Sequence, residues 1–234
     1  MPAHADISAL YEVQSEDDFE QAIDFAMTIE VSESGDARLH ITGRTGYFLI
    51  RKGEAYKISR GVDGPYAEKL DDLDAVIANA GQAGGISLEL LDQLPPIELV
   101  DSGKIKVGSW EGSGFARREY GELGRPELVI SQDASLKPIG EAFARLLDGR
   151  FGALRSLSLT NLFGGFGFYD PEVQKLLEAG TPIRLNSLDL TSLSQEDIEP
   201  ARFELPARVL TREEISAQNT PFEWAPAFDR QPTG

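Results

Sequence analysis

Alternation of apolar and polar residues over short runs is the feature that most limits the fold of this chain. Met27, Ile29 and Val31 share one face of an extended segment, and residues 37–41 repeat the pattern after the polar stretch SESGD. A period of two residues is typical of a β-strand with one buried face. These runs predict a hairpin, which the stretches YFLIRKG and EAYKISR extend to an antiparallel meander of about four strands over residues 25–69.

A second group of short runs predicts further strands of the same sheet. The stretches IELVDSG, KIKVGSWEG, GFARREYG and PELVISQD follow one another between residues 97 and 133 and are separated by glycines. Residues 181–194, TPIRLNSLDLTSLS, read as one more alternating strand, and ARFELPA at 201–207 reads as a short terminal strand. Together with the first meander they predict a single sheet of about eight or nine strands.

Helical patterns separate these groups of strands. Residues 71–81 begin with acidic residues and end at a glycine, residues 135–149 carry apolar residues at spacings of three and four, and residues 170–180 combine Asp170 as N-cap with a proline in the first turn. Weaker helical patterns occupy residues 87–94 and 153–163. The order predicts an α+β domain in which a large curved antiparallel sheet, a half-barrel, wraps a cluster of helices.

The charge balance limits the partners of the chain. The 39 acidic residues outnumber the 22 basic ones, so the net charge at pH 7 is -17. Such a charge repels nucleic-acid phosphates and anionic lipid headgroups. No stretch approaches the roughly 18 to 20 apolar residues of a membrane-spanning helix. We therefore expect a globular chain that binds no nucleic acid and does not span a membrane.

Few residues of the chain suit catalysis or metal binding. The sequence has no cysteine and two histidines, His4 near the terminus and His40 on the polar face of a predicted strand. A histidine-rich metal site is thus excluded, and a Ser-His-Asp triad would depend on His40 alone. The acidic runs at 16–18 and 71–74 lack calcium-loop spacing, and helix capping explains acidic residues at helix starts. We expect no catalytic residue, no metal and no cofactor.

The N-terminus carries a pattern that suggests export. Ala3, His4 and Ala5 fit the small-x-small pattern that signal peptidase cleaves, with Asp6 as the first mature residue. The alternative is a chance occurrence of this pattern. On the first interpretation the protein is periplasmic or otherwise exported, and a lipid anchor upstream of residue 1 would fit as well. The predicted division is an N-terminal segment at 1–24, one domain at 25–212 and a loosely attached tail at 213–234.

Four stretches resemble a known family. VDSGKIKVGSWEG, ELVISQDASLKPIG, EAGTPIRL and ARFELPA are similar to segments of the LolA and LolB-like group of exported bacterial proteins. The resemblance runs from about Ile29 to Ala207 and implies a half-barrel with helices on its concave side. Members with known roles carry the acyl chains of lipoproteins in a hydrophobic cavity between sheet and helices. The resemblance therefore implies an apolar ligand, without assigning its lining residues one by one.

An unusual aromatic stretch, LFGGFGFYDP at 162–171, provides the candidate binding residues. Its rings are separated by glycines, so it could form a mobile flap over an apolar cavity or a patch for a partner. The alternative is that the rings plug the end of the core. If a hydrophobic ligand binds, the residues expected near its lining or mouth are Phe143, Leu147, Phe163, Phe166, Phe168 and Tyr169.

Two functions fit these observations. The first is binding of a lipid, an acyl chain or another hydrophobic small molecule in a cavity between sheet and helices. The second is a non-catalytic interaction with a protein partner through an acidic surface or a sheet edge, which the net charge of -17 suggests.

Overall fold

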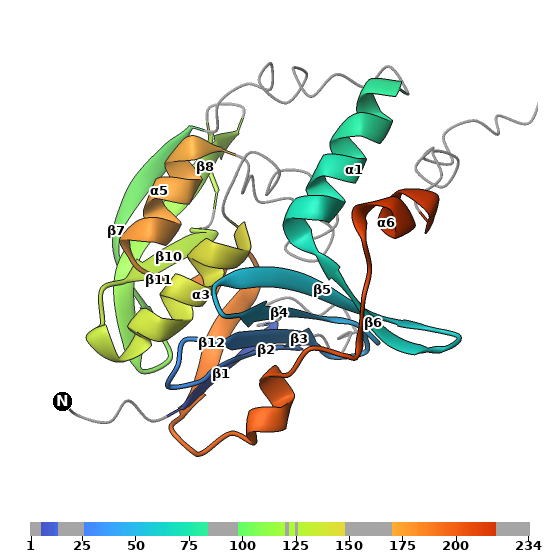
Figure 1. The fold of residues 1–234 in the computed structure, drawn as a ribbon. Helices are drawn as coiled ribbons and strands as arrows, with labels where there is room; N and C mark the ends of the chain where they lie inside the picture. The colour runs from blue at the N-terminus through green and yellow to red at the C-terminus, as the bar shows by residue number, and fades with distance from the viewer. Residues whose placement is uncertain are drawn as a thin grey trace, which may run out of the picture.

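The computed structural model describes residues 6–13, 26–83, 98–119, 122–124, 126–147 and 170–218 of the 234-residue chain. These residues form one large mixed sheet with α-helices, so the predicted α+β class is confirmed (Figure 1). The predicted helices at 87–94 and 153–163 lie outside the described residues.

The first half of the chain forms six strands and a helix. Their bounds are β1 (Ile7–Val13), β2 (Ala26–Val31), β3 (Ala37–Ile41), β4 (Tyr47–Arg51), β5 (Glu54–Gly61), β6 (Gly64–Lys69) and α1 (Leu70–Ala83). The second half alternates strands and helices. Their bounds are β7 (Leu99–Val107), β8 (Trp110–Glu119), β9 (Glu122–Leu123), β10 (Leu128–Ser131), the 3-10 turn η1 (Ala134–Leu136), α3 (Lys137–Leu147), α5 (Pro171–Ala179), β11 (Thr181–Leu185), β12 (Leu188–Ser194), the 3-10 turn η2 (Pro200–Phe203), β13 (Arg208–Val209) and α6 (Arg212–Gln218).

The described residues give a sheet of 13 strands, more than the sequence predicted. Twelve follow the order β13-β6-β5-β4-β3-β2-β1-β12-β11-β10-β8-β7, and β9 pairs with β8 beside this path. The sheet is not closed, since β13 and β7 are its two ends. The prediction of a wholly antiparallel sheet is wrong at one end, where β13 runs parallel to β6.

Strand β1 corrects the predicted start of the domain. The sequence interpretation left residues 1–24 outside the fold, but β1 pairs with β2 on one side and β12 on the other. Its alternate residues Ile7, Ala9 and Tyr11 are buried. One of these three is a small alanine, so the apolar period of this strand is weak in the sequence. A strand from the chain start therefore joins the two halves of the sheet.

Three predicted strands need correction. The stretch KIKVGSWEG contains the β7–β8 turn, where Gly108 has a φ of 55°, and TPIRLNSLDLTSLS contains the β11–β12 turn, where Asn186 also has a φ of 55°. Each turn divides a run that alternates on both sides of it. ARFELPA is no strand, because Pro200 begins the 3-10 turn η2 there.

The predicted loose tail from residue 213 onward is wrong for its first part. Helix α6 packs against α1, and its Ile215 is fully buried there with Leu73 and Val76 of α1. A single buried isoleucine among polar neighbours gives little sequence signal. Residues 219–234 lie outside the described residues.

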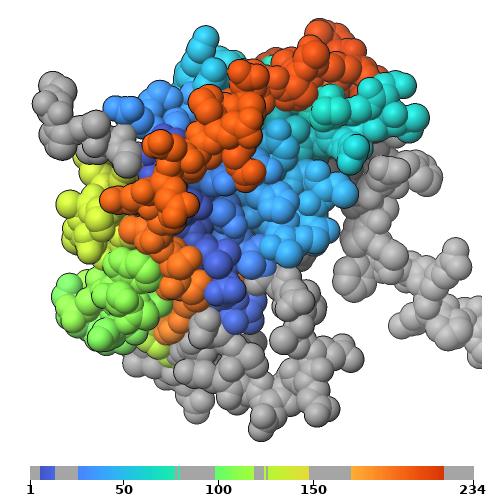
Figure 2. Space-filling model, turned by 90° about the horizontal axis from the view of Figure 1, so that it is seen from below, coloured from blue at the N-terminus to red at the C-terminus, as the bar shows by residue number. Residues whose placement is uncertain are grey.

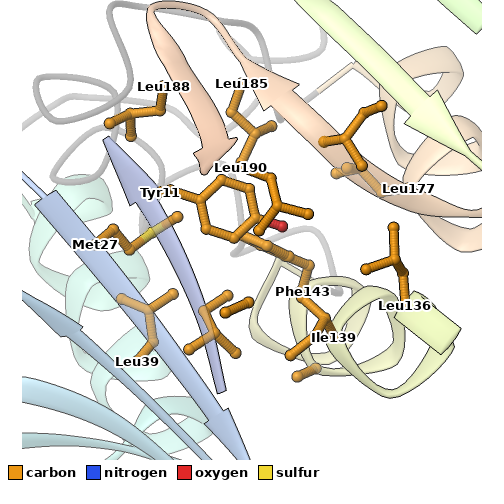
Figure 3. Close-up of a cluster of buried hydrophobic side chains, with 14 of the residues drawn as sticks. Tyr11, Met27, Leu39, Leu136, Ile139, Phe143, Leu177, Leu185, Leu188 and Leu190 are labelled. Carbon is orange, nitrogen blue, oxygen red and sulfur yellow. The ribbon is translucent and has the colours of Figure 1, made fainter. Parts of the chain in front are cut away.

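Helices α3 and α5 cover one face of the sheet. Helix α3 contacts β1, β2, β4 and β11, and α5 contacts β10 and β11 (Figure 1). The predicted N-cap of α5 is present, since the Asp170 carboxylate accepts a hydrogen bond from the Glu172 N–H. The predicted end of the first helix at Gly81 is wrong, because α1 continues to Ala83. The main core lies between this face and these helices, and it includes Tyr11, Met27, Leu39 and Phe143 (Figure 3).

The opposite face of β4, β5 and β6 has a cluster of its own. Leu49, Ile58 and Ala67 are buried there beneath Phe203 of η2. Figure 2 shows the segment after β12, in orange to red, lying across strands of the N-terminal half in blue to cyan. The Glu30 carboxylate also holds this segment by accepting hydrogen bonds from Arg202 at 2.7 and 3.1 Å.

Candidate ligand-binding groove

A groove of about 850 Å³ opens between α3 and the ends of strands β1, β2 and β4. We call it the α3 groove. Pro138, Glu141, Ala142 and Arg145 form its helix wall, and the β2–β3 turn with Glu33 forms part of the facing wall. Those four residues of α3 are spaced three and four apart, so they share one side of the helix.

The floor of the α3 groove is apolar. It consists of Ile7 at the start of β1, Val31 at the end of β2 and Ile50 near the end of β4. These strand ends lie side by side, because Ile7 pairs with Val31, Val31 pairs with Ala37, and Ala37 pairs with Ile50. The three side chains are themselves only 3 to 4% exposed, so the groove ends at the margin of the main core.

Two carboxylates fix the turns that border the groove. Asp6 accepts hydrogen bonds from the N–H of Glu33 and the N–H of Ile198, both at 2.8 Å. Asp36 accepts one from the N–H of Lys52 at 2.7 Å and forms an ion pair with Arg51. The β2–β3 turn is thereby tied to the β4–β5 turn and to the segment after β12, which gives the groove a preorganised wall.

The rim of the groove is charged. Lys137 and Glu141 form an exposed ion pair along α3, with 3.5 Å between Nζ and Oε1. Arg145 lies against the β4–β5 turn, where a methyl group on Gly53 would be 3.5 Å from its Nη2. In the part of the chain that the structure describes, Arg145 forms no ion pair, and neither does Glu33 across the groove. An apolar floor with a charged rim suits an amphiphilic ligand.

Two smaller cavities adjoin this region. One of about 380 Å³ lies on the other side of the β2–β3 turn, between Asp36, Arg51 and Phe203, and in it Asp36 and Arg51 form an ion pair with each other. The other, of about 300 Å³, lies where α3 meets the start of β11, and Gly140 allows the Thr181 side chain close approach there. The Thr181 hydroxyl donates to the Leu136 carbonyl at 2.8 Å. The Asp36–Arg51 ion pair and the Thr181 hydrogen bond thus serve the fold.

The structure places two of the predicted binding residues in the main core. Phe143 is 1% exposed and Leu147 is 4% exposed, and neither lines any of the three cavities described above. Phe143 packs against Tyr11, so the space between sheet and helix is filled at this point. The other predicted binding residues, Phe163, Phe166, Phe168 and Tyr169, lie outside the described residues.

The sequence interpretation did not find the residues that line the groove. Ile7 fell in the segment assigned to the N-terminus, Glu33 in a turn, and Arg145 on the polar face of a predicted helix. No local pattern links these three positions, because their proximity depends on strand pairing. The sequence signal available was limited to Arg145, a cation in the last turn of an otherwise well-defined helix.

The ionisable groups with shifted pKa values support structure. Burial raises the pKa of Tyr11, whose hydroxyl donates to the Pro182 carbonyl at 2.7 Å. Burial, together with a hydrogen bond to Glu54, raises the pKa of Tyr56 to about 12. Hydrogen bonds from the Ser135 hydroxyl and N–H lower the pKa of Asp133, which caps η1. Each shift has a cause in packing or capping.

The described residues include neither a candidate metal site nor a candidate membrane-spanning helix. Among these residues, no cluster of three or more histidines or carboxylates has an arrangement that could hold a metal ion. No described helix combines the length and apolar character needed to cross a bilayer.

Comparison with known proteins gives no relative. No family model matches the sequence, and no curated protein or solved structure shows significant similarity to the chain. The LolA and LolB-like assignment therefore depends on the four short stretches quoted above and stays a prediction.

Proposed function

We propose that the protein binds the apolar part of a lipid or another amphiphile in the α3 groove and has no catalytic role. The observation that carries this proposal is the groove itself, whose volume of about 850 Å³ lies within the range of small-molecule sites, roughly 300 to 1,000 Å³. Its floor of Ile7, Val31 and Ile50 offers an apolar surface at the margin of the core.

Burial of an acyl chain supplies the driving force for such binding. Each methylene removed from water contributes about 0.8 kcal/mol, so about ten of them contribute on the order of 8 kcal/mol before the cost of association is subtracted. Ordered walls reduce that cost, and Asp6 and Asp36 fix the turns beside the groove. Hydrophobic binding therefore requires no reactive group at this site.

We place the ligand in the α3 groove, beside the ends of β1, β2 and β4, and not in the interior between sheet and helices. The resemblance implies a half-barrel with its cavity between sheet and helices, and we retain the half-barrel as part of the proposal. The contact of Tyr11 with Phe143 argues for a ligand at the open end of that space. The aromatic stretch at 162–171 stays a candidate flap on sequence grounds.

We also propose that the protein is exported. Cleavage after Ala5 would leave Asp6 as the first residue, which is the carboxylate that holds Glu33 and Ile198. Strand β1 begins one residue later, so this cleavage would keep every strand and helix that the structure describes. Mass determination of the mature protein from its native source tests the cleavage point, and a mature chain that keeps residues 1–5 contradicts it.

The binding proposal is tested by titration with a fluorescent fatty acid in the absence of detergent. Ala142→Phe places a ring in the α3 groove and should weaken uptake, whereas Ala144→Phe adds the same ring to the same helix outside the groove and should not. Near-ultraviolet circular dichroism checks that both variants stay folded. Ala142 is 5% exposed, so a larger side chain at this position overpacks the core at a cost of about 1 to 3 kcal/mol. Pro138 is half-buried, and Pro138→Phe therefore serves as a second groove variant.

The outcomes separate the two functions considered. Uptake by the unmodified protein that falls in both groove variants supports the proposal, and absence of uptake by the unmodified protein overturns it. Absence of uptake would favour a protein-interaction module, for which the end strand β7 is the candidate surface. Residues 101–104 of β7 are exposed, and strands at a sheet edge can accept a further strand from a partner.

A further inference from the structure

We infer that the amphiphile bound in the α3 groove carries an anionic headgroup, a carboxylate or a phosphate, which pairs with Arg145. This inference rests on the proposed function and names the ligand class of the same site. It follows from the distribution of charge along the groove.

The helix wall presents two cations with different surroundings. Lys137 has its counter-ion in Glu141, one helical turn away. Arg145 has no ion-pair partner among the described residues, and it lines the groove at the end farthest from Lys137 along α3. The charge available to a ligand on this wall is therefore the guanidinium of Arg145.

The β4–β5 turn leaves room for that guanidinium. Lys52 and Gly53 both have positive φ values, 49° and 79°, which form a tight turn between the two strands. Arg145 Nη2 would lie 3.5 Å from a methyl group at Gly53, so the guanidinium lies beside the bare backbone of this glycine. The turn geometry favours glycine at this position, and the absence of a side chain keeps space open around Arg145.

A guanidinium selects an anion with two oxygens. Its planar fork of N–H groups matches carboxylate and phosphate geometry. The net charge of -17 does not prevent this, because charges beyond about 8 to 10 Å are largely screened at physiological salt. On the helix wall Lys137 is paired with Glu141, so Arg145 is the cation that remains open to the headgroup.

Arg145 has an alternative role in the fold. A cation in the last turn of a helix interacts favourably with the helix dipole, and Arg145 lies in the last turn of α3. That role predicts an effect on stability and none on the choice between ligands. The test must therefore compare ligands that share a twelve-carbon chain and differ in headgroup charge.

The test measures the affinities of dodecanoate, dodecanol and dodecyltrimethylammonium at slightly alkaline pH, each by displacement of one fluorescent probe. The unmodified protein should bind dodecanoate up to about fivefold more tightly than dodecanol, the range of an exposed ion pair, and the ammonium compound least tightly. Arg145→Met should abolish the preference for dodecanoate and leave the affinity for dodecanol unchanged. Lys175→Met on α5 removes one positive charge outside the groove and should keep the preference.

The results distinguish the inferred role of Arg145 from the proposed binding of an amphiphile in the groove. Equal affinity of the unmodified protein for dodecanoate and dodecanol, or a preference that survives in Arg145→Met, overturns the role of Arg145. Failure of all three compounds, including dodecanol, overturns the proposed function instead.

Discussion

The ring of Tyr11 meets the ring of Phe143 edge to face, with 5.6 Å between centroids and an angle of 87° between planes (Figure 3). Tyr11 lies on β1 near the start of the chain, and Phe143 lies on α3 in its second half. Both rings are buried, so this pair fills the interior between the sheet and the helix. The ligand site that we propose therefore lies at the margin of this core, in the α3 groove, and not at Phe143.

Phe143→Ala should lower the free energy of unfolding by about 3 to 5 kcal/mol, because it removes a buried ring and leaves a cavity. Urea denaturation followed by circular dichroism measures the change. Val62 is a matched control, since it is fully exposed at the β5–β6 turn, and Val62→Ala should change stability by less than about 0.5 kcal/mol. A Phe143→Ala protein as stable as the parent would contradict the core position of this ring.

Tyr11→Phe should cost about 1 to 3 kcal/mol of stability, because it leaves the buried Pro182 carbonyl without the hydroxyl that now donates to it at 2.7 Å. The ring itself is retained, so the contact with Phe143 persists. Tyr66→Phe is the control, since the Tyr66 hydroxyl forms no hydrogen bond within the described part of the chain. Equal denaturation midpoints for the two variants would argue against the Tyr11 hydrogen bond.

Stability should fall as the pH rises above about 10, the ordinary pKa of tyrosine. Burial raises the pKa of both Tyr11 and Tyr56, that of Tyr56 to about 12, so the unfolded chain releases these protons at lower pH than the folded one. The stabilisation is complete below the unfolded pKa and is lost as the pH rises through the folded values. Urea midpoints at a series of alkaline pH values measure the slope, and Tyr56→Phe should make it shallower.

Asp6→Ala should loosen one wall of the α3 groove. The change removes the acceptor of the Glu33 and Ile198 N–H groups, and the loss of such capping bonds costs about 0.5 to 2 kcal/mol. Amide hydrogen exchange at Glu33 should accelerate, and uptake of the fatty-acid probe should weaken. Asp63→Ala at the exposed β5–β6 turn is the control for loss of one carboxylate, and unchanged exchange at Glu33 in Asp6→Ala would refute the role of Asp6.

Local sequence patterns predicted a helix or strand correctly where that element has its own period or cap. The alternation from Met27 to Ile41 predicted the β2–β3 hairpin, and the cap at Asp170 with the proline after it predicted the start of α5. They failed where two strands with the same alternation period follow each other across a short turn. The Asn186 turn between β11 and β12 was missed, since Asn-Ser is a weaker turn signal than Asn-Gly and both flanking runs keep the same period.

The sequence by itself determined the α+β class, most strand and helix segments and the strongly acidic surface, because these depend on residue periodicity, caps and charge within a few positions. The tertiary structure alone decided that β1 lies at the centre of the sheet and that Ile7, Glu33 and Arg145 border one groove. Strand order depends on pairing between residues far apart in the chain, such as Tyr11 with Leu190. A groove forms from the ends of several such elements, so its residues share no pattern that a linear sequence displays.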